Sequence, residues 1–301
     1  MPLVVTGAVG IDQVETPTGS ASEVVGGSGI YFPAAASYFT RPRVVSVVGD
    51  DFTDEHVAVF DQFNIDREGL ERRAGGKTFR WHGRYHDNMN DRDTVGIELG
   101  VLTEAPPPLP AAYGDSDYVF LAVDQPVNQL ALLDKLPKRK LSVMDTIDLY
   151  IDTQRDEVVD VIGKVDGVIV NDSEAMALTG ERNAVSAADA IAAMGPAFVV
   201  VKKGEHGAIA KHRDGWAALP AYPSDRVVDP TGAGDSFAGA MMGHFASTDG
   251  DTSLPNLRKA LAYGTVVASF NIEDFSLGRM IGLTRAEIDG RYDEFTSMLE
   301  V

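Results

Sequence analysis

Short apolar runs alternate with helix-like segments through the second half of the chain. The runs "DYVFLAV", "KLSVMDT", "DGVIVN" and "AFVVVKKG" are rich in valine, and the segments between them space their apolar residues as helices do. Continuous Val/Ile runs that alternate with helices are typical of a parallel sheet covered on both faces. The pattern predicts an α/β fold, with a doubly wound, mostly parallel sheet and helices on both sides.

The first half of the chain adds two further strands and a different kind of segment. Residues 3–12 and 43–51 read as buried strands, whereas residues 15–29 alternate between turn residues and short strands. Residues 75–99 are aromatic, basic and alternating, which predicts a β-ribbon that stands off the main body. We therefore expect one domain over residues 1–301, with a small β-sheet lid contributed by about 12–27 and 75–103.

Composition narrows the class of protein. The 301 residues carry 45 acidic and 26 basic side chains, a formal net charge of −19, which is the opposite of what phosphate backbones attract. No apolar run approaches the roughly 20 residues of a membrane helix. There is no cysteine, and therefore no thiol nucleophile, disulfide or cysteine zinc site. We expect a cytoplasmic protein that binds neither nucleic acid nor membrane.

The stretch "VVDPTGAGDSFAGAMMG" at residues 227–243 joins a β-branched run to a helix of small residues. Backbone N–H groups of Gly232, Ala233 and Gly234 at a helix N-terminus predict an anion site, since the helix dipole favours negative charge there. The negative charge of Asp235 makes it a poor phosphate ligand. A carboxylate at this place could instead act as a base that orients an attacking hydroxyl and accepts its proton. We expect the helix terminus to lower the pKa of Asp235. The alternative is a helix-capping aspartate in an ordinary glycine turn.

This stretch resembles the D-x-T-G-A-G-D-x-F motif of the ribokinase/PfkB family of carbohydrate kinases. "NDSEAMALTG" resembles the N-x-x-E motif of that family, and "VVVKKGEHGAIA" resembles its strand–G-x-x-G nucleotide segment. "GGSGIYFPAAAS" and "GAVGID" resemble its di-glycine motif and its opening strand, and all five occur in the family's order. The first motif is matched by Asp229, Thr231, Gly232, Ala233, Gly234, Asp235 and Phe237.

The resemblance implies a ribokinase-like fold, ATP as phosphoryl donor and Mg²⁺ as cofactor, with a monovalent cation such as K⁺ near Asp229. It assigns the metal and the phosphates to Asn171 and Glu174, with Asp229 as a further metal candidate. The nucleotide would lie along Gly204 and Gly207. The acceptor would contact Asp12, Gly26, Gly27 and, where many members of the family have asparagine, Tyr31.

Several residues leave two interpretations open. Lys202 and Lys203 stand where ribokinase-like chains have threonine, and either contact phosphate or solvate a strand end. Arg80 and Arg84 share one strand face, where they either bind an anionic substrate group or pair with surface acids. Trp81 and Tyr85, on the opposite face, support either a homodimer through the lid or ordinary packing.

Three other patterns do not predict sites. "GGKT" at 75–78 lacks the first glycine of a P-loop, because position 71 is glutamate. "GAVG" lacks the third glycine of a dinucleotide fingerprint. His82 and His86 share a strand face without a nearby third metal ligand.

We therefore expect a kinase that transfers the γ-phosphoryl group of ATP to a hydroxyl of a sugar, nucleoside or related polyol. Asp235 would be its base, and the backbone of residues 232–234 its anion hole. Two alternatives remain: a kinase of a phosphorylated sugar, whose phosphate the arginines would bind, and a non-catalytic nucleotide or metabolite sensor.

Overall fold

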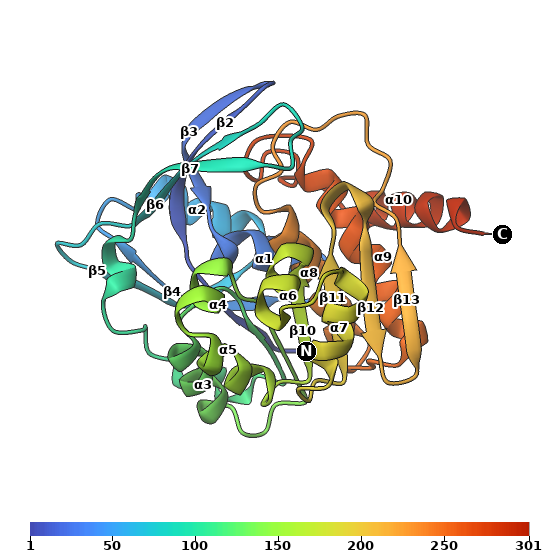
Figure 1. Cartoon of the computed structure of the whole chain (residues 1–301). Helices are drawn as coiled ribbons and strands as arrows, with labels where there is room; N and C mark the ends of the chain where they lie inside the picture. The colour runs from blue at the N-terminus through green and yellow to red at the C-terminus, as the bar shows by residue number, and fades with distance from the viewer. Residues whose placement is uncertain (301) are drawn as a thin grey trace.

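A computed structural model describes residues 1–300 and contains one large sheet of nine strands in the order β13-β12-β11-β10-β9-β8-β1-β4-β5 (Figure 1). Seven consecutive strands of that order, from β11 to β5, run parallel, and β12 and β13 add an antiparallel hairpin at one edge. The strands are β1 (Leu3–Thr6), β4 (Pro42–Gly49), β5 (Asp66–Arg73), β8 (Tyr118–Leu121), β9 (Leu141–Met144), β10 (Gly167–Asn171), β11 (Phe198–Lys202), β12 (Ala208–His212) and β13 (Gly215–Leu219).

Helices cover both faces of this sheet, which confirms the predicted doubly wound class. Successive residues of β10 alternate between two cores, with Ile169 in one and Val168 and Val170 in the other. The first core is closed by α1 (Ser28–Ala36), α2 (Asp54–Gln62), α8 (Ala233–Ser247), α9 (Leu254–Asn271) and α10 (Arg285–Met298). The second is closed by α3 (Pro126–Lys135), α4 (Asp148–Thr153), α5 (Arg155–Ile162), α6 (Asp172–Thr179) and α7 (Ala184–Ala192).

A second, smaller sheet stands beside the large one, at the upper left of Figure 1. Its order is β3-β2-β6-β7, from β2 (Gly10–Thr16), β3 (Gly19–Gly26), β6 (Phe79–Tyr85) and β7 (Arg92–Glu98). The central pair β2 and β6 is parallel, and the two outer pairs are antiparallel. Short 3₁₀ turns follow at Gly100–Thr103, Ala111–Asp115 and Gly204–His206.

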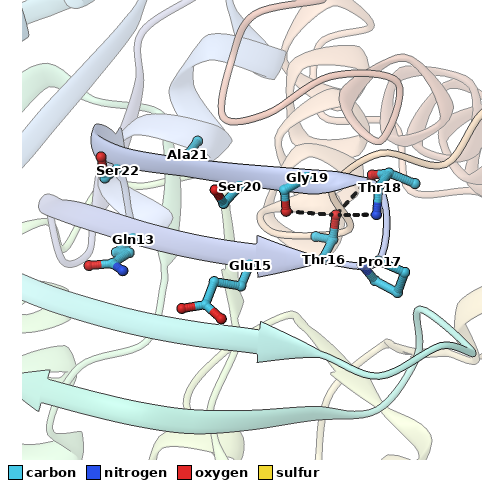
Figure 2. Close-up of a pocket in the computed structure, with 9 residues that line it drawn as sticks. All are labelled: Gln13, Glu15, Thr16, Pro17, Thr18, Gly19, Ser20, Ala21 and Ser22. Carbon is cyan, nitrogen blue, oxygen red and sulfur yellow. Dashed lines mark hydrogen bonds between the residues drawn. The ribbon is translucent and has the colours of Figure 1, made fainter.

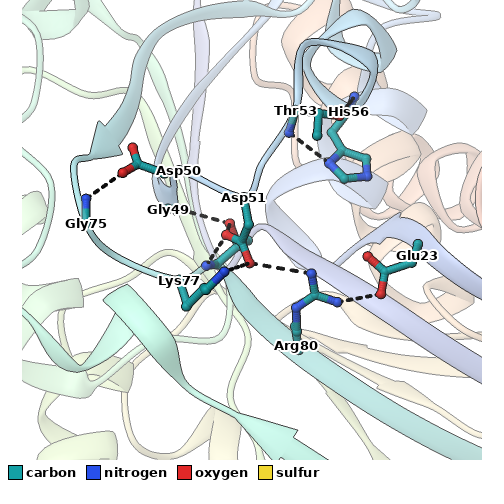
Figure 3. Close-up of polar contacts among 10 residues, drawn as sticks. Glu23, Gly49, Asp50, Asp51, Thr53, His56, Gly75, Lys77 and Arg80 are labelled. Atoms are coloured by element: carbon teal, nitrogen blue, oxygen red, sulfur yellow. Dashed lines mark hydrogen bonds and ion pairs between the residues drawn. The ribbon is translucent and has the colours of Figure 1, made fainter.

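Polar contacts attach the small sheet to the loop after β4 (Figure 3). The Asp51 carboxylate accepts hydrogen bonds from the backbone N–H and the hydroxyl of Thr78, at 2.7 and 2.8 Å. The Arg80 guanidinium reaches Asp51 at 3.4 Å and Glu23 at 2.6 Å. The "GGKT" stretch therefore braces one sheet against the other, in agreement with its rejection as a P-loop.

The turn between β2 and β3 makes a second contact with the body of the protein. It carries an open hollow of about 510 Å³, lined by small and polar residues such as Thr16, Gly19 and Ser20 (Figure 2). The neighbouring Thr18 hydroxyl donates to the backbone carbonyl of Val228 at 3.2 Å. This bond connects the small sheet to the segment that leads into α8.

Among residues 1–300, none of the helices combines the length and the apolar character needed to cross a membrane.

Close packing of α1 against α8 depends on Gly239. A β-carbon at this position would lie 2.2 Å from the backbone carbonyl oxygen of Phe32, whereas one at Gly290 of α10 would meet nothing within 4 Å. We expect Gly239→Ala to lower the free energy of unfolding by about 1–3 kcal/mol through overpacking. Gly290→Ala, the matched control, should raise it by roughly 0.5–1 kcal/mol because alanine favours the helix. Urea unfolding measures both, and equal effects would contradict this account of the contact.

Candidate functional site

The loop before α8 presents unpaired backbone donors. Its last residue, Gly232, has a left-handed φ of 75°, and a β-carbon there would lie 2.3 Å from the Tyr31 ring. Within residues 1–300 the N–H groups of Gly232, Gly234 and Asp235 have no hydrogen-bond acceptor, so they are free to bind an anion. The prediction for Ala233 is wrong, because its N–H donates to the carbonyl oxygen of Pro230 at 3.1 Å. The N–H of Asp235 takes its place.

Asp235 lies in the first turn of α8, but its pKa differs from the expected one. Part of its side chain remains accessible, yet burial by the surrounding protein and the negative charge of Asp145 raise the pKa of Asp235 to about 7. The positive charges of Lys202 and Arg92 oppose this rise only in part. The predicted lowering is therefore wrong, because desolvation and a like charge outweigh the helix terminus.

Lys202, at the end of β11, is the positive charge at the centre of the site. Its ammonium lies 3.1 Å from Asp145 and 3.2 Å from the place that a β-carbon of Gly234 would take. Burial alone would lower the pKa of Lys202, but Asp145, Glu174 and Asp235 outweigh it and raise that pKa. Lys202 is therefore a charged residue beside the free N–H groups. Lys203 instead donates its backbone N–H to the carbonyl of Gly207 at 2.7 Å.

Sequence reasoning missed Asp145. The residue follows β9 directly and is 5% exposed, and it lies at the carboxyl edge of the parallel strands, as do Asn171 and Lys202. Ligands of doubly wound folds bind at this edge. An acid placed directly after a buried strand was therefore a usable signal, although the pairing with Lys202 was not visible in the sequence.

Asn171 and Glu174 of the N-x-x-E motif form a capping box at the start of α6. The Asn171 side chain accepts from the N–H of Glu174 at 2.7 Å, and Glu174 accepts from the N–H of Asn171 at 2.8 Å. Burial and the nearby charge of Asp145 raise the pKa of Glu174 despite Lys202. The capping box fixes the direction of Glu174 and leaves its second oxygen free.

A cleft of about 550 Å³ opens beside these residues. Lys202, Gly204 and Gly207 line one side, and Ala233 and Gly234 line another. Most of the remaining lining is apolar or small, including Ala208, Ala221, Pro223, Phe237 and Ala268. The predicted nucleotide residues Gly204 and Gly207 thus lie together with the start of α8.

The turn between β6 and β7 reaches the same cleft. Asn88, Met89 and Asn90 belong to its lining. The side-chain amide of Asn90 donates to Glu205 at 2.9 Å, which joins the small sheet to the turn after β11. Sequence reasoning missed this contact, because nothing in the spacing of residues 86–91 indicates how far the hairpin reaches.

Asp12 of β2 lies near enough to Asp235 for the two negative charges to interact. It is 3% exposed, and its Oδ1 atom is buried without a hydrogen-bond partner, as are the hydroxyls of Ser28 and Tyr31. Burial, together with the charges of Asp229 and Asp235, raises the pKa of Asp12 to about 7. Unpaired buried polar atoms are costly in a folded protein. This cluster therefore fits a polar ligand that supplies the missing hydrogen bonds.

The di-glycine positions make room for this arrangement. A β-carbon at Gly26 would lie 1.8 Å from the Asp12 carboxylate, and one at Gly27, whose φ is 90°, would lie 2.3 Å from the carbonyl oxygen of Ala8. Gly26 and Gly27 therefore shape the surroundings of Asp12 through their lack of side chains.

Asp229 and Glu174, the two metal candidates, belong to different neighbourhoods. Asp229 is fully buried and accepts from the N–H groups of Thr231 at 2.9 Å and Ser276 at 3.3 Å. Burial raises its pKa, while these hydrogen bonds lower it in part. No group of three His, Asp or Glu side chains with metal-ligand geometry occurs within residues 1–300.

The arginines and aromatic residues of the small sheet divide between its two faces. Arg80 pairs in register with Ile11 and Glu98, whereas Trp81 pairs with Asp12 and Ile97. Arg80 thus points to the face opposite Asp12, where it binds Asp51 and Glu23. Arg84 binds Glu15 on the same face, at 2.7 Å. These contacts favour the second interpretation of Arg80 and Arg84, in which both arginines pair with acidic side chains.

Tyr85 and Arg92 lie on the face of Asp12. Tyr85 is 7% exposed, and the hydroxyl of Thr231 donates to its oxygen at 3.2 Å. Arg92 is its register partner on β7 and lies near enough to lower the pKa of Asp235. The small sheet therefore contacts the glycine–aspartate loop directly.

Comparison with known proteins agrees with this geometry. Residues 4–281 match the family described as pfkB family carbohydrate kinase. The chain belongs to the pfkB family. Its members transfer phosphoryl groups to alcohols, so this chain is a sugar or nucleoside kinase of the ribokinase type.

Individual relatives of this pfkB kinase include nucleoside kinases. A cytidine kinase of Thermococcus kodakarensis is 29% identical over 255 residues, which is 82% of this chain and 89% of the relative. A nucleoside kinase of Burkholderia thailandensis in complex with inosine superposes with a TM-score of 0.79 at 20% identity, over 97% of both chains. A ribokinase of Cryptococcus neoformans in complex with ADP superposes with a TM-score of 0.78 at 18% identity, over 96% and 99%.

Removal of Lys202 should disturb the charge balance of this site strongly. The side chains of Lys202 and Asp145 are 17% and 7% exposed, so Lys202→Met would leave a buried, uncompensated carboxylate. We expect a loss of about 3 kcal/mol in the free energy of unfolding. The pKa of Asp235 should rise further, because the substitution removes a positive charge that lowers it. Lys203→Met is the matched control and should leave both quantities nearly unchanged. Chemical unfolding and the pH dependence of turnover measure the difference, and equal losses for the two lysines would contradict the assignment.

Proposed function

We propose that this pfkB kinase transfers the γ-phosphoryl group of ATP to a hydroxyl group of a nucleoside. One observation carries the proposal: the start of α8 lines the apolar cleft through Gly234, and Gly232 before it packs against the ring of Tyr31, whose hydroxyl is buried without a partner, as is the Oδ1 atom of Asp12. The free N–H groups lie at this junction. A phosphoryl group held there would have a donor on one side and an acceptor hydroxyl on the other.

The cleft suits an adenine nucleotide. Its apolar lining fits a base, and Lys202 with the free N–H groups at the start of α8 fits phosphates. The ribokinase relative bound to ADP supports ATP as donor. In this arrangement Gly204 and Gly207 border the nucleotide, and Lys202 contacts its phosphates rather than Lys203.

Asp235 is the residue that we assign as base. A pKa of about 7 lets its carboxylate exist at neutral pH and still accept a proton effectively. The carboxylate orients the acceptor hydroxyl and takes its proton as the oxygen attacks phosphorus. The N–H groups of Gly232, Gly234 and Asp235 hold the oxygens of the transferred group, which is where a phosphoryl transition state carries its charge.

The residues around Lys202 also fit Mg²⁺. Glu174 has one oxygen outside its capping bond, and Asp145 contacts Lys202, which lines the cleft, so two acids lie close to the proposed phosphate position. Mg²⁺ is usually held by one or two carboxylates together with substrate phosphates. When bound, the ion would neutralise phosphate charge. Asp229 is the weaker candidate, since each of its oxygens already accepts one backbone N–H, and its role as a metal ligand stays a prediction from the resemblance. A K⁺ ion near Asp229 remains a prediction from the resemblance.

Asp12 is the residue that we assign to the hydroxyl groups of the acceptor. A carboxylate accepts hydrogen bonds from neighbouring hydroxyls, and its Oδ1 atom, with the Ser28 and Tyr31 hydroxyls, lacks protein partners. The cytidine kinase relative and the nucleoside kinase bound to inosine support a nucleoside as acceptor. A phosphorylated sugar is less well supported, because Arg80, expected to bind its phosphate, already pairs with Asp51 and Glu23.

Replacement of the proposed base separates transfer from binding. We expect Asp235→Asn to lower kcat by about 10³-fold, since general-base catalysis contributes roughly 10²–10⁴-fold. Nucleotide affinity should stay within a few-fold, because the backbone donors remain. Coupled ADP release measures kcat, and calorimetry measures the affinity for ATP. Turnover close to that of the unchanged enzyme, with the same melting temperature, would refute the assignment.

The pH dependence of turnover should report the same carboxylate. The ionised form of Asp235 is the competent one, so activity should fall about tenfold per pH unit below pH 7 and level off above it. Asp12 also titrates near 7, and the two interacting acids share the apparent pKa values. Asp12→Asn tests which acid matters: it should raise KM for the acceptor and leave an acid limb in kcat. A kcat independent of pH between 5.5 and 7 would contradict Asp235 as base.

A further inference from the structure

Three residues form one row across the small sheet on the side that faces the acceptor. Asp12 of β2, Trp81 of β6 and Ile97 of β7 are register partners, so their side chains point to the same face. A hollow of about 250 Å³ at the edge of this row is lined by the three residues together with Arg80 and Glu23, whose side chains meet on the opposite face. We infer that the Trp81 indole is a stacking platform for the base of a nucleoside acceptor, and so determines specificity for nucleosides over free sugars. The inference rests on the proposed function, because it concerns the acceptor of the same site.

The indole lies flat on the sheet because of the residue two positions further along β6. A β-carbon at Gly83 would lie 2.0 Å from the six-membered ring of Trp81, so any other residue would push the ring away. Side chains of a strand normally stand out from the sheet. Because Gly83 has no side chain, the Trp81 ring can instead pack parallel to the sheet, with one face against the backbone at Gly83.

The ring is fixed in its plane as well. Its Nε1–H donates to the Thr94 hydroxyl on β7 at 3.2 Å, and the Arg92 guanidinium lies 5.9 Å from the ring centre. Trp81 nevertheless stays half-buried, and the neighbouring Ile97 is 56% exposed. A large aromatic ring held flat and only partly covered, next to an exposed aliphatic side chain, offers a base-sized apolar surface.

The row combines the two chemistries that a nucleoside contains. The Asp12 carboxylate, with its unpartnered oxygen, suits ribose hydroxyls, and the adjacent indole suits a flat base. Base–aromatic stacking is effective for every base because all of them have a π-face. A free pentose has no base and gains nothing from Trp81. The platform should therefore improve nucleoside binding over ribose by tenfold or more.

The sequence holds two tryptophans, which makes the platform directly observable. Trp216 lies on β13, where Lys211 stacks on it at 4.9 Å, and it belongs to neither hollow of the site. In the Trp216→Phe enzyme, Trp81 is the sole indole. Titration with inosine and with cytidine should quench its fluorescence, and D-ribose should not. The Trp81→Phe enzyme, which keeps Trp216, is the control and should show no quenching by any of the three.

Kinetics provide the second measurement. Trp81→Ala should raise KM for inosine and cytidine about tenfold or more and leave KM for D-ribose unchanged, while Trp81→Phe should retain most nucleoside affinity. Gly83→Val should raise the KM values as Trp81→Ala does, because the valine side chain would displace the indole ring from its position on the sheet. Melting temperatures identify a variant that has lost its fold. The fluorescence titration of the Trp216→Phe enzyme does not depend on these variants, because it leaves Trp81 and Gly83 unchanged.

The outcomes separate this inference from the proposed function. Quenching by nucleosides without phosphoryl transfer would refute the proposed function and leave the platform standing. Phosphoryl transfer to nucleosides without quenching, or with a KM that Trp81→Ala does not change, would overturn the platform alone. Absence of nucleoside binding by either measurement would also overturn it.

Discussion

A single lysine holds together the charge balance on which the site depends. Lys202 lies among Asp145, Glu174 and Asp235, and each of the three raises its pKa. In return its positive charge opposes the rise in the pKa values of Asp235 and Glu174 that burial and the charge of Asp145 cause. The parallel sheet makes this possible, because β9, β10 and β11 end side by side and deliver these residues to one edge. Asp235, with a pKa of about 7, is therefore partly ionised near neutral pH despite its burial.

The small sheet contacts the loops of the candidate site, although its strands lie far from those loops in the sequence. Thr18 binds the carbonyl of Val228, Thr231 binds Tyr85, and Asn90 binds Glu205, so three points of the sheet touch the loops around α8 and β11. The brace of Thr78 on Asp51 fixes its other end. The first turn of α8 is therefore covered by a separate layer that carries Asp12, the residue that we propose for the acceptor.

The sequence was sufficient for the fold class, and it singled out most residues of the candidate site, because both leave local patterns. Alternating valine runs indicated the sheet, and the glycine–aspartate turn indicated the donors at α8. Interactions between charges far apart in the chain could not be predicted from the sequence. The pKa of Asp235 depends on Asp145, 90 positions earlier in the chain. Arg80 pairs with Asp51 and Glu23, which no local pattern indicates. The free N–H of Asp235 and the paired one of Ala233 likewise depend on the exact turn geometry. The single domain, the homodimer and the cytoplasmic location stay predictions.

The hairpin of β6 and β7 contacts both halves of the candidate site, which can couple the binding of ligands in the two halves. Its first strand carries Trp81 and Tyr85 on the face of Asp12, while its tip joins Glu205, a residue that lines the cleft, through Asn90. One element thus contacts both halves of the site. If a ligand in one half strengthens these contacts, it should raise the affinity of the other half, and the second ligand should raise the affinity of the first by the same factor.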